Sequence, residues 1–504
     1  MDTSTGIDFG DMQGLVRFAH GRLTESAFIL LRIRNRAAAG EWLATAQVTA
    51  ATVLEEPPSA ALQLAFTAHG LLAMGLSESI VSAFSPEFIS GMSGDKNRSR
   101  RLGDTGTNAP EHWAWGGADA NVDLLLILYS GTGGIDEQLT RLHNEPFDNA
   151  FDSLETLVSK SVGPEEPFGF ADGISQPEID WRQAASTDTH QRATYSNLLA
   201  PGEIVLGYRN EYGLYTARPL LNPAQTEDIG HLPPAADRPA LKDLGRNGSY
   251  LVLRQLSQDV GGFWSHLDEQ ANGDTARREQ LAAAMVGRQR DGTPLVGRST
   301  HPIPGISPGQ ANNDFSFDDD PLGRQCPIGS HVRRANPRTG DLPPGVSGLL
   351  QRLLRTLGFG RRHPGEDLIA STRFHRILRR GRAYGSQLDP EQALSDESAE
   401  GVSQERGLIF VCLGANLSRQ FEFVQGAWMA SSKFAGLPTE SDPLLGNRQP
   451  LLDGTATDSF SRPQAGAPAH ITQSLPQFVT VRGGAYFFMP GLRALDFIVQ
   501  RARS

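Results

Sequence analysis

The feature that most limits the fold is the alternation of short, strongly apolar runs with longer segments of helical spacing. The runs SAFILLRI (26–33) and VDLLLILYS (122–130) are typical of buried strands. The segment EWLATAQVTAATVL (41–54) has the spacing of a helix, and NGSYLVLRQLSQDVGGFWSHLDEQA (247–271) predicts a strand followed by a helix. Interleaved strands and helices of this kind, with antiparallel-looking neighbours, predict an α+β fold.

Three later segments extend this pattern. GLIFVCLGA (407–415) predicts a strand whose alternation puts Leu408 and Phe410 on one face. NLSRQFEFVQGAWMASS (416–432) predicts a helix, and FVTVRGGAYFFMPGL (478–492) predicts two short strands around a Gly-Gly turn.

The length of the chain indicates two domains, because 504 residues exceed what one typical core contains. A proline-rich, weakly patterned stretch at about 217–246 is the expected linker. We therefore expect an N-terminal domain at 1–216 and a C-terminal domain at 217–504. The second domain contains three loop-like insertions, at 293–323, 341–367 and 386–407.

Charge and cysteine content exclude several classes of partner. A formal net charge of −11 leaves no broad basic surface for nucleic acid. Cys326 and Cys412 have no metal-binding spacing and support no disulfide framework, so a reducing compartment is expected. The first residues lack the pattern of a secretory signal, and the longest apolar runs are too short to span a membrane. These features predict a cytoplasmic protein with no membrane partner.

The stretch FGFADGISQP (168–177) places Asp172 between Gly169 and Gly173. Glycines allow the backbone to turn sharply where a side chain would clash. Asp-Gly is also a common turn dipeptide, so this stretch alone does not distinguish a turn aspartate from a functional carboxylate.

The stretch CPIGSHVRRANPR (326–338) contains His331 and, within the next seven residues, three arginines. A lone histidine is more often an ordinary surface or core residue than a ligand. The arginines favour a ligand, because a porphyrin needs an axial donor for its iron and cations for its two propionates. A second basic stretch, FHRILRRGRAYG (374–385), is compatible with a solvated face.

Taken together, these segments resemble the dye-decolorizing peroxidases, a family of haem enzymes. The resemblance rests on the Gly-x-x-Asp-Gly motif at 169–173, on SHVRRANPR (330–338) and on ILRRGRAYG (377–385). RGLIFVCLGANLSRQFEFVQGAW (406–428) and RGGAYFF (482–488) also match, and the motifs follow in the family's order. The resemblance implies two ferredoxin-like domains of the dimeric α+β barrel type. The first would carry the distal aspartate loop, and the second would hold most of the haem.

The resemblance also implies roles for individual residues. His331 would be the axial ligand of the iron in one haem b per chain. Asp172 and Arg379 would be catalytic residues over the opposite face, the first moving a proton of hydrogen peroxide and the second stabilising charge on the departing oxygen. The enzyme would oxidise dyes, phenolics and other bulky organic reductants by one-electron steps. Homo-oligomer formation is left open.

Further residues match family positions around the haem. Arg338 would contact a propionate. Leu408 and Phe410 would line the distal pocket, and Asp442 would hydrogen-bond the other nitrogen of the axial histidine. A turn or capping aspartate is an equal alternative for Asp442. Gly381 departs from the pattern, because other family members can carry a polar side chain there.

The main alternative is a haem carrier or an iron-releasing protein on the same fold. Such a protein would need His331 but would have little use for both Asp172 and Arg379, so their joint presence favours an enzyme. The acidic stretch DFSFDDD (314–320) raises the alternative of a calcium or manganese site. No ligand pattern completes such a site, so a solvated loop is expected.

Overall fold

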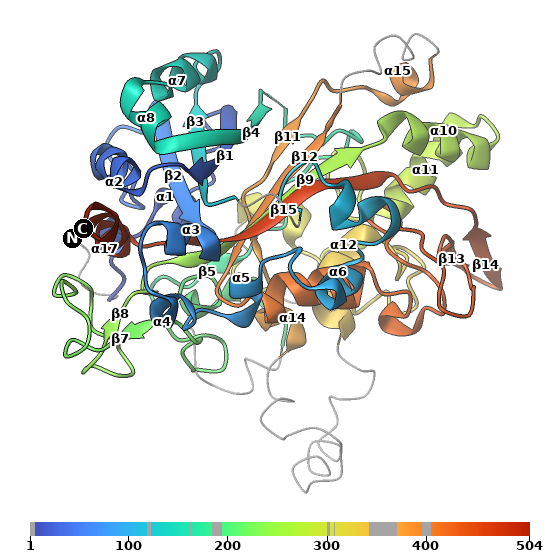
Figure 1. The fold of residues 1–504 in the computed structure, drawn as a ribbon. Coiled ribbons are helices and arrows are strands. Elements are labelled where there is room, and N and C mark those ends of the chain that lie inside the picture. Colours follow the sequence, from blue (N-terminus) through green and yellow to red (C-terminus); the bar gives the residue numbers. More distant parts are fainter. Residues whose placement is uncertain are drawn as a thin grey trace, which may run out of the picture.

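The structure, a computed structural model, describes residues 6–117, 122–160, 163–183, 194–299, 303–306, 308–341, 370–395 and 405–504. Its main feature is one large antiparallel sheet that crosses the molecule (Figure 1). The strands lie in the order β10-β12-β9-β15-β2-β3-β1-β4, and β11 also pairs with β12.

The first half of this sheet is a ferredoxin-like unit. Its chain order is strand, helix, strand, strand, helices, strand, and its strands lie in the order β2-β3-β1-β4 with antiparallel neighbours. Strand β3 is buried along its whole length between β1 and β2, which explains its continuous apolar run. The elements are β1 (Glu25–Ile33), α2 (Arg36–Thr45), β2 (Ala60–Phe66), β3 (Leu124–Ser130), α7 (Ile135–Leu142), α8 (Glu145–Ala150) and β4 (Phe151–Ser159).

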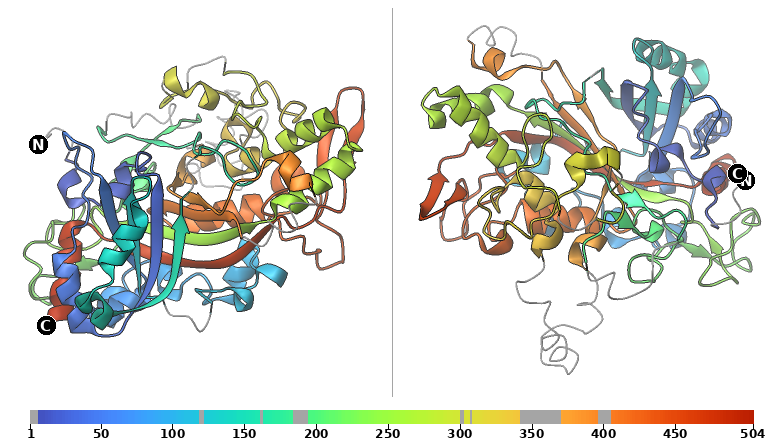
Figure 2. Two further views of the ribbon diagram at one scale, coloured as in Figure 1. Left: turned by 90° about the horizontal axis from the view of Figure 1, so that it is seen from above. Right: turned by 180° about the vertical axis from the view of Figure 1, so that it is seen from behind.

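The second half repeats this topology with the order β10-β12-β9-β15. Its elements are β9 (Ser249–Gln258), α10 (Val260–Ala271), α11 (Thr275–Val286), β10 (Leu378–Arg379), β11 (Arg382–Tyr384), β12 (Gly407–Gly414) and β15 (Val479–Met489). Strands β9 and β15 run side by side across the molecule (Figure 2). The two halves join where Phe488 of β15 pairs with Phe66 of β2, and α17 (Leu492–Arg503) packs against α2. The predicted α+β fold with two ferredoxin-like units is confirmed.

Residues 160–248 connect the two units and include the Asp172 loop. The predicted linker lies in this connection, and the boundary between residues 216 and 217 stays a prediction. The predicted insertion at 341–367 lies almost entirely outside the described residues. Shorter elements include α1 (Gly14–Arg17), α3 (Ala68–Ala73), α4 (Glu78–Val81), α5 (Pro86–Ser90), α6 (Lys96–Leu102), β5 (Glu178–Ile179), β6 (Leu198–Leu199), β7 (Leu220–Leu221), β8 (Lys242–Asp243), α12 (His331–Ala335), α14 (Ser371–Phe374), α15 (Pro390–Leu394), β13 (Phe460–Gln464) and β14 (Ala467–Thr472).

The predicted helix at 41–54 is only partly right, because helix α2 ends at Thr45. Beyond Thr45 the backbone N–H groups bond to other segments instead of continuing the helix. The N–H of Thr49 donates to the carbonyl of Leu62, and the N–H of Ala51 donates to the carbonyl of Met12. These bonds hold the segment extended against β2.

The predicted Gly-Gly turn at 478–492 is wrong, because β15 runs through Gly483 and Gly484 as one strand. The strand contains a register shift between Val481 and Gly483 where it pairs with β9. A side chain at Gly483 would lie 2.4 Å from the indole of Trp115. Gly483 therefore makes room for a ring that packs on the strand, rather than for a turn.

The predicted helix at 416–432 is helical, but its turns are wide. Two π-helical segments occupy Ser418–Glu422 and Val424–Met429. The N–H of Ala430 donates to the carbonyl of Gln425, five residues earlier, as a π-helix requires.

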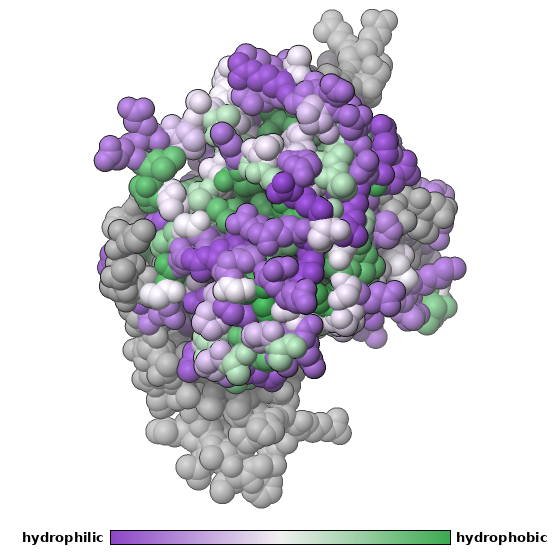
Figure 3. All heavy atoms as spheres, turned by 60° about the vertical axis from the view of Figure 1, so that its left-hand side comes forward, coloured by the Kyte–Doolittle hydropathy of each residue, from purple (hydrophilic) through white to green (hydrophobic). Residues whose placement is uncertain are grey.

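The outer surface mixes polar and apolar side chains on the face shown in Figure 3. Within the described residues, no helix is both long and apolar enough to cross a membrane. Cys326 and Cys412 are free thiols, and both are buried.

Candidate active site

A cavity of about 250 Å³ lies against one face of β9, β12 and β15. Leu256 of β9, Leu408 and Phe410 of β12 and Val481 of β15 line it. Ile409, between these two β12 residues, and Val411, which follows them, point to the opposite face and pack into a separate core. The alternation predicted for this strand is therefore confirmed, and its even-numbered face is the one that meets the cavity.

Asp172 reaches this cavity from the glycine-flanked turn. Gly169 and Gly173 both have positive φ, at 89° and 79°, a conformation that glycine adopts without strain. The N–H of Asp172 donates to the carbonyl of Pro164 over 2.9 Å. The side chain of Asp172 is 43 % exposed, and its exposed part faces the cavity.

Arg379 meets Asp172 at the same wall. Its Nη1 lies 2.8 Å from Oδ1 of Asp172, and its backbone N–H donates to Oε1 of Gln176. Arg379 ends the short strand β10, where it pairs with Cys412 of β12. Burial raises the pKa of Asp172, but Arg379, helped by the Gly173 amide and His331, outweighs burial and holds that pKa below its ordinary value.

His331 begins helix α12 and also lines the cavity. Its Nδ1 lies 3.1 Å and 3.2 Å from the two carboxylate oxygens of Asp442. Oδ1 of Asp442 also accepts the backbone N–H groups of Leu444 and Leu445. When Nδ1 donates to Asp442, the neutral ring carries its lone pair on Nε2, the atom that can bind a metal.

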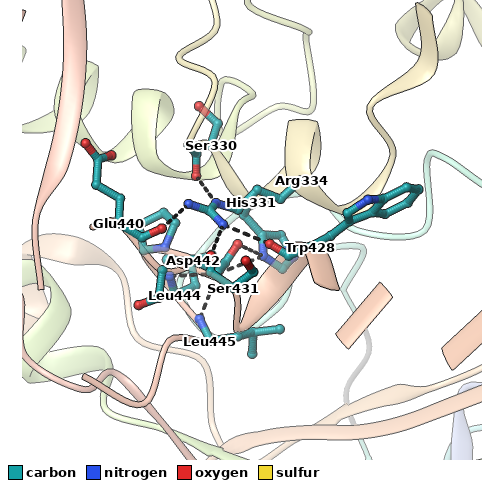
Figure 4. A network of polar contacts seen from close by, with 12 residues as sticks. Ser330, His331, Arg334, Trp428, Ser431, Glu440, Asp442, Leu444 and Leu445 are labelled. Carbon is teal, nitrogen blue, oxygen red and sulfur yellow. Dashed lines mark hydrogen bonds and ion pairs between the residues drawn. The ribbon is translucent and has the colours of Figure 1, made fainter. Parts of the chain in front are cut away.

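Electrostatics couple the two groups of this pair. Burial lowers the pKa of His331, but the charge and hydrogen bond of Asp442 outweigh it and raise the pKa above its ordinary value. Burial raises the pKa of Asp442, but His331 and then Arg334 outweigh it and lower the pKa. The guanidinium of Arg334 is fully buried beside the pair (Figure 4) and donates to the carbonyls of Gly329, Trp428, Ser431 and Glu440.

Of the three arginines that follow His331, only Arg338 lines the cavity. Arg333 instead binds the carboxylate of Asp320 and the carbonyl of Cys326. Asp320 belongs to the acidic stretch expected to be a solvated loop, yet it is buried and also accepts three backbone N–H groups. Within the described part of the chain, no group of three acidic, histidine or cysteine side chains is arranged to hold a metal ion.

Arg338 is almost wholly buried and has a positive φ of 52°. Its Nη1 donates to the carbonyls of Asn313 and Phe315. The Cζ of its guanidinium lies 3.7 Å from the centroid of the Phe315 ring. Its Nε is buried and has no hydrogen-bond partner among the described residues. One donor of this arginine is therefore unused at the cavity.

Two further arginines, Arg288 and Arg376, lie on the cavity wall. Arg376 belongs to the basic stretch at 374–385, whereas Arg288 lies in no motif that would single it out in the sequence. Arg288 donates to the hydroxyl of Ser175, and Arg376 donates to that of Tyr195. In the described part of the chain, neither these two nor Arg338 forms an ion pair with a carboxylate. Burial, then Arg338 and Arg379, lowers the pKa of Arg288 to about 10. Such a group of buried cations suits an anionic ligand.

Gly381 does not reach the cavity. A side chain there would lie 2.5 Å from the carbonyl oxygen of Ile409 on β12. The position therefore has no room for a polar side chain.

Two titratable residues of the wall were not among the predicted site residues. Glu166 accepts a hydrogen bond from Gln258, and burial raises its pKa to about 7. His375 stacks on Phe423 with ring centroids 3.6 Å apart, and burial lowers its pKa to about 4. Only the folded chain shows that either residue meets Asp172 in one cavity.

Comparison with known proteins gives the family. No family model matches the chain. A multifunctional dye peroxidase of Amycolatopsis is 30 % identical over an alignment of 471 positions that covers 86 % of this chain and 81 % of that protein. A dye-decolorizing peroxidase of Mycetinis scorodonius is 29 % identical and covers 88 % of this chain and 77 % of its own. The solved decolorizing peroxidase of Auricularia auricula-judae superposes with a TM-score of 0.69, at 23 % identity, over 99 % of this chain and 100 % of its own.

The chain belongs to the dye-decolorizing peroxidase family. It is an oxidoreductase that acts on peroxide, and peroxidases of this family depend on haem and oxidise dyes and phenolics. These relationships favour an enzyme over the alternative of a haem carrier.

Proposed function

We propose that this chain binds one haem b in the cavity, with Nε2 of His331 as the axial ligand of the iron. Three observations on the cavity fit such a group. The hydrogen bond from Nδ1 to Asp442 leaves Nε2 as the donor atom. Apolar residues of three strands cover one face of the space, and the Nε of Arg338 and neighbouring buried guanidinium groups offer partners for propionates.

The haem, when bound, supplies an iron that takes oxidising equivalents from hydrogen peroxide and passes them to a reductant one electron at a time. Asp172 accepts a proton from the peroxide oxygen and returns it to the oxygen that leaves as water. Arg379 keeps Asp172 ionised and stabilises negative charge on the departing oxygen. The single observation that carries this proposal is the Asp172–Arg379 ion pair on the wall of the cavity that His331 also lines.

The other predicted residues support this chemistry. Leu408 and Phe410 form an apolar wall that limits water near Asp172. Asp442 fixes the ring orientation of His331 and makes Nε2 a stronger donor. The reductants that the enzyme oxidises are dyes, phenolics and other bulky molecules. A solved relative has been crystallised with 2,6-dimethoxyphenol, at 22 % identity.

We also propose a cytoplasmic location, supported by the two buried free thiols, which need no oxidising compartment. Fractionation of cells that express the chain tests this. Recovery in a secreted or membrane fraction would contradict it.

The catalytic assignment is tested with Asp172→Asn and Arg379→Leu. Both variants should keep haem, because neither residue binds it. Each should slow the reaction with hydrogen peroxide by about two to four powers of ten, as measured by stopped-flow absorption. Arg141→Leu, which removes an exposed arginine from α7, is the matched control and should react normally. Normal rates in both cavity variants would refute the assignment.

A further inference from the structure

Glu166 is a carboxylate on the cavity wall to which the proposed reaction gives no role. It lies in the same loop as Asp172, six residues earlier. Burial raises its pKa to about 7, while hydrogen bonds from Gln258 and from the amides of Phe168 and Phe170 act in the opposite direction. An enclosed carboxylate is costly unless it is hydrogen-bonded, so its partners indicate what it does.

Glu166 closes the turn that leads to Asp172, through its main chain and its side chain. Its own N–H donates to the carbonyl of Phe170 over 2.9 Å, and the N–H of Gly169 donates to its carbonyl over 2.7 Å. The carboxylate then accepts the N–H of Phe168 on Oε2 and the N–H of Phe170 on Oε1, each over 3.1 Å. The loop is thus wrapped around one carboxylate, and the bond from Phe170 lies two residues before Asp172.

Aromatic packing fixes this turn to helix α10. The ring of Phe168 lies 4.5 Å from that of Phe263, centroid to centroid. The ring of Phe170 lies parallel to that of Trp264, at 6.5 Å. All four side chains are buried in one core, so the turn has a fixed place relative to the helix.

Gln258 connects the turn to the sheet. It is the last residue of β9, and its Nε2 donates to Oε2 of Glu166 over 2.7 Å. Strand β9 pairs with β12, and β12 pairs with β10, which ends at Arg379. The bond between Gln258 and Glu166 therefore links the loop that carries Asp172 to the sheet that carries Arg379.

We propose that Glu166, held by Gln258, is a positioning residue for Asp172. The pair forms a clasp that sets where the Asp172 carboxylate stands relative to Arg379 before peroxide enters. The inference rests on the proposed catalytic role of Asp172. Three donors occupy the Glu166 carboxylate, so it acts through the geometry of the loop and not on the substrate.

The first test is Glu166→Gln. An amide side chain offers one acceptor oxygen and sets an NH₂ group against the donors, so the clasp opens. Haem content should stay normal, and the rate constant with hydrogen peroxide should fall about tenfold to a hundredfold, as a misplaced catalytic group costs. Glu165→Gln makes the same chemical change at the exposed neighbouring residue and should react like the unaltered chain. Gln258→Leu cuts the link from the sheet side and should show a smaller loss of the same kind.

The second test separates positioning from general damage. Hydrogen exchange of the Phe168 and Phe170 amides, measured in haem-free protein, should be faster in Glu166→Gln and unchanged in Glu165→Gln. In an Asp172→Asn background, Glu166→Gln should slow the peroxide reaction no further, because it acts through Asp172.

The outcomes of these tests are distinguishable. Equal slowing by Glu166→Gln in both backgrounds would overturn the positioning role. So would unchanged amide exchange together with an unchanged peroxide rate while Asp172→Asn is impaired. A normal peroxide rate in Asp172→Asn itself would instead overturn the proposed function, and this inference with it.

Discussion

Asp172 on the cavity wall and Asp442 behind His331 are both carboxylates, and they are held differently. Asp442 has no exposed surface, and its oxygens accept hydrogen bonds from His331 and from two backbone amides. The side chain of Asp172 is 43 % exposed, toward the cavity, and Arg379 binds one of its oxygens. Asp442 is thus fixed in both place and charge, whereas Asp172 can exchange a proton with a molecule that enters the cavity.

The segments that carry Asp442 and Asp172 also differ in how firmly they are held. Asp442 stands beside Arg334, whose buried guanidinium binds four backbone carbonyls and ties several segments together. Asp172 follows a turn with glycine on both sides, and Arg379 ends a two-residue strand at the edge of the sheet. The difference teaches that the His331 side, which would hold the iron under the proposed function, is built for permanence and the Asp172 side for access.

The strongest way to break this comparison is His331→Ala. The iron then loses its proposed protein ligand while the arginines remain, so the purified variant should contain little haem. The ratio of Soret to protein absorbance measures this. His143→Ala, an exposed histidine, is the control and should bind haem normally. A full, normal Soret band in His331→Ala would mean that another histidine, such as His375, is the ligand.

Asp442→Asn tests the Asp442–His331 hydrogen bond on the side of the site that is firmly held. Oδ1 accepts two backbone N–H groups, so the asparagine oxygen must take that place and its NH₂ must face His331. The NH₂ would donate to Nδ1 and leave the ring hydrogen on Nε2, the atom needed by the iron. We expect haem affinity to fall about tenfold to a hundredfold, measured by transfer of haem to a competing apoprotein. Asp442→Ala, which cannot donate, should lose less affinity, and the reverse order would contradict this account.

The smallest expected effect is on the pH dependence of the peroxide reaction, which Asp172 sets. Because Arg379 holds the pKa of Asp172 below its ordinary value, the peroxide reaction should stay fast in mild acid and decline only below about pH 4. In Arg379→Leu the largest opposing charge is lost and only the Gly173 amide and His331 still oppose burial, so the acid limb should move to higher pH. In Asp172→His the limb should lie near the imidazole value of about 6.5. Rate constants with peroxide across pH measure all three, and one common acid limb would exclude Asp172 as the proton acceptor.

Local patterns in the sequence predicted much of the framework. The strand at 407–415 was correct down to the face that carries Leu408 and Phe410, because alternation is a property of the strand itself. The Gly-Gly turn was wrong because the partner of Gly483 is Trp115, more than 360 residues away in the chain. A glycine that admits a distant ring has the same local signature as a glycine that turns.

The site residues also divide into those with a local sequence signal and those whose surroundings come from distant parts of the chain. Asp172, His331 and Arg379 were found because they sit in recognisable motifs, and the structure brings them to one cavity. Glu166 and Arg288 belong to no such motif. Their surroundings are created by contacts with Gln258 and Ser175, each far away in the chain. Arg333 is the opposite case. It belongs to a recognisable motif, and its neighbour Val332 lines the cavity, but the Arg333 side chain binds Asp320 instead.

Strand β15 follows every other strand of the main sheet in the chain, yet it lies between β9 and β2 at the centre. During synthesis on the ribosome, the edges of β2 and β9 therefore stay open until residues 479–489 have left the exit tunnel. Open strand edges pair readily with other chains, so a stalled or shortened chain is prone to aggregate. His331, the Asp172–Arg379 pair and the clasp all reach the ribosome's exterior before the strand that joins the two halves of the sheet.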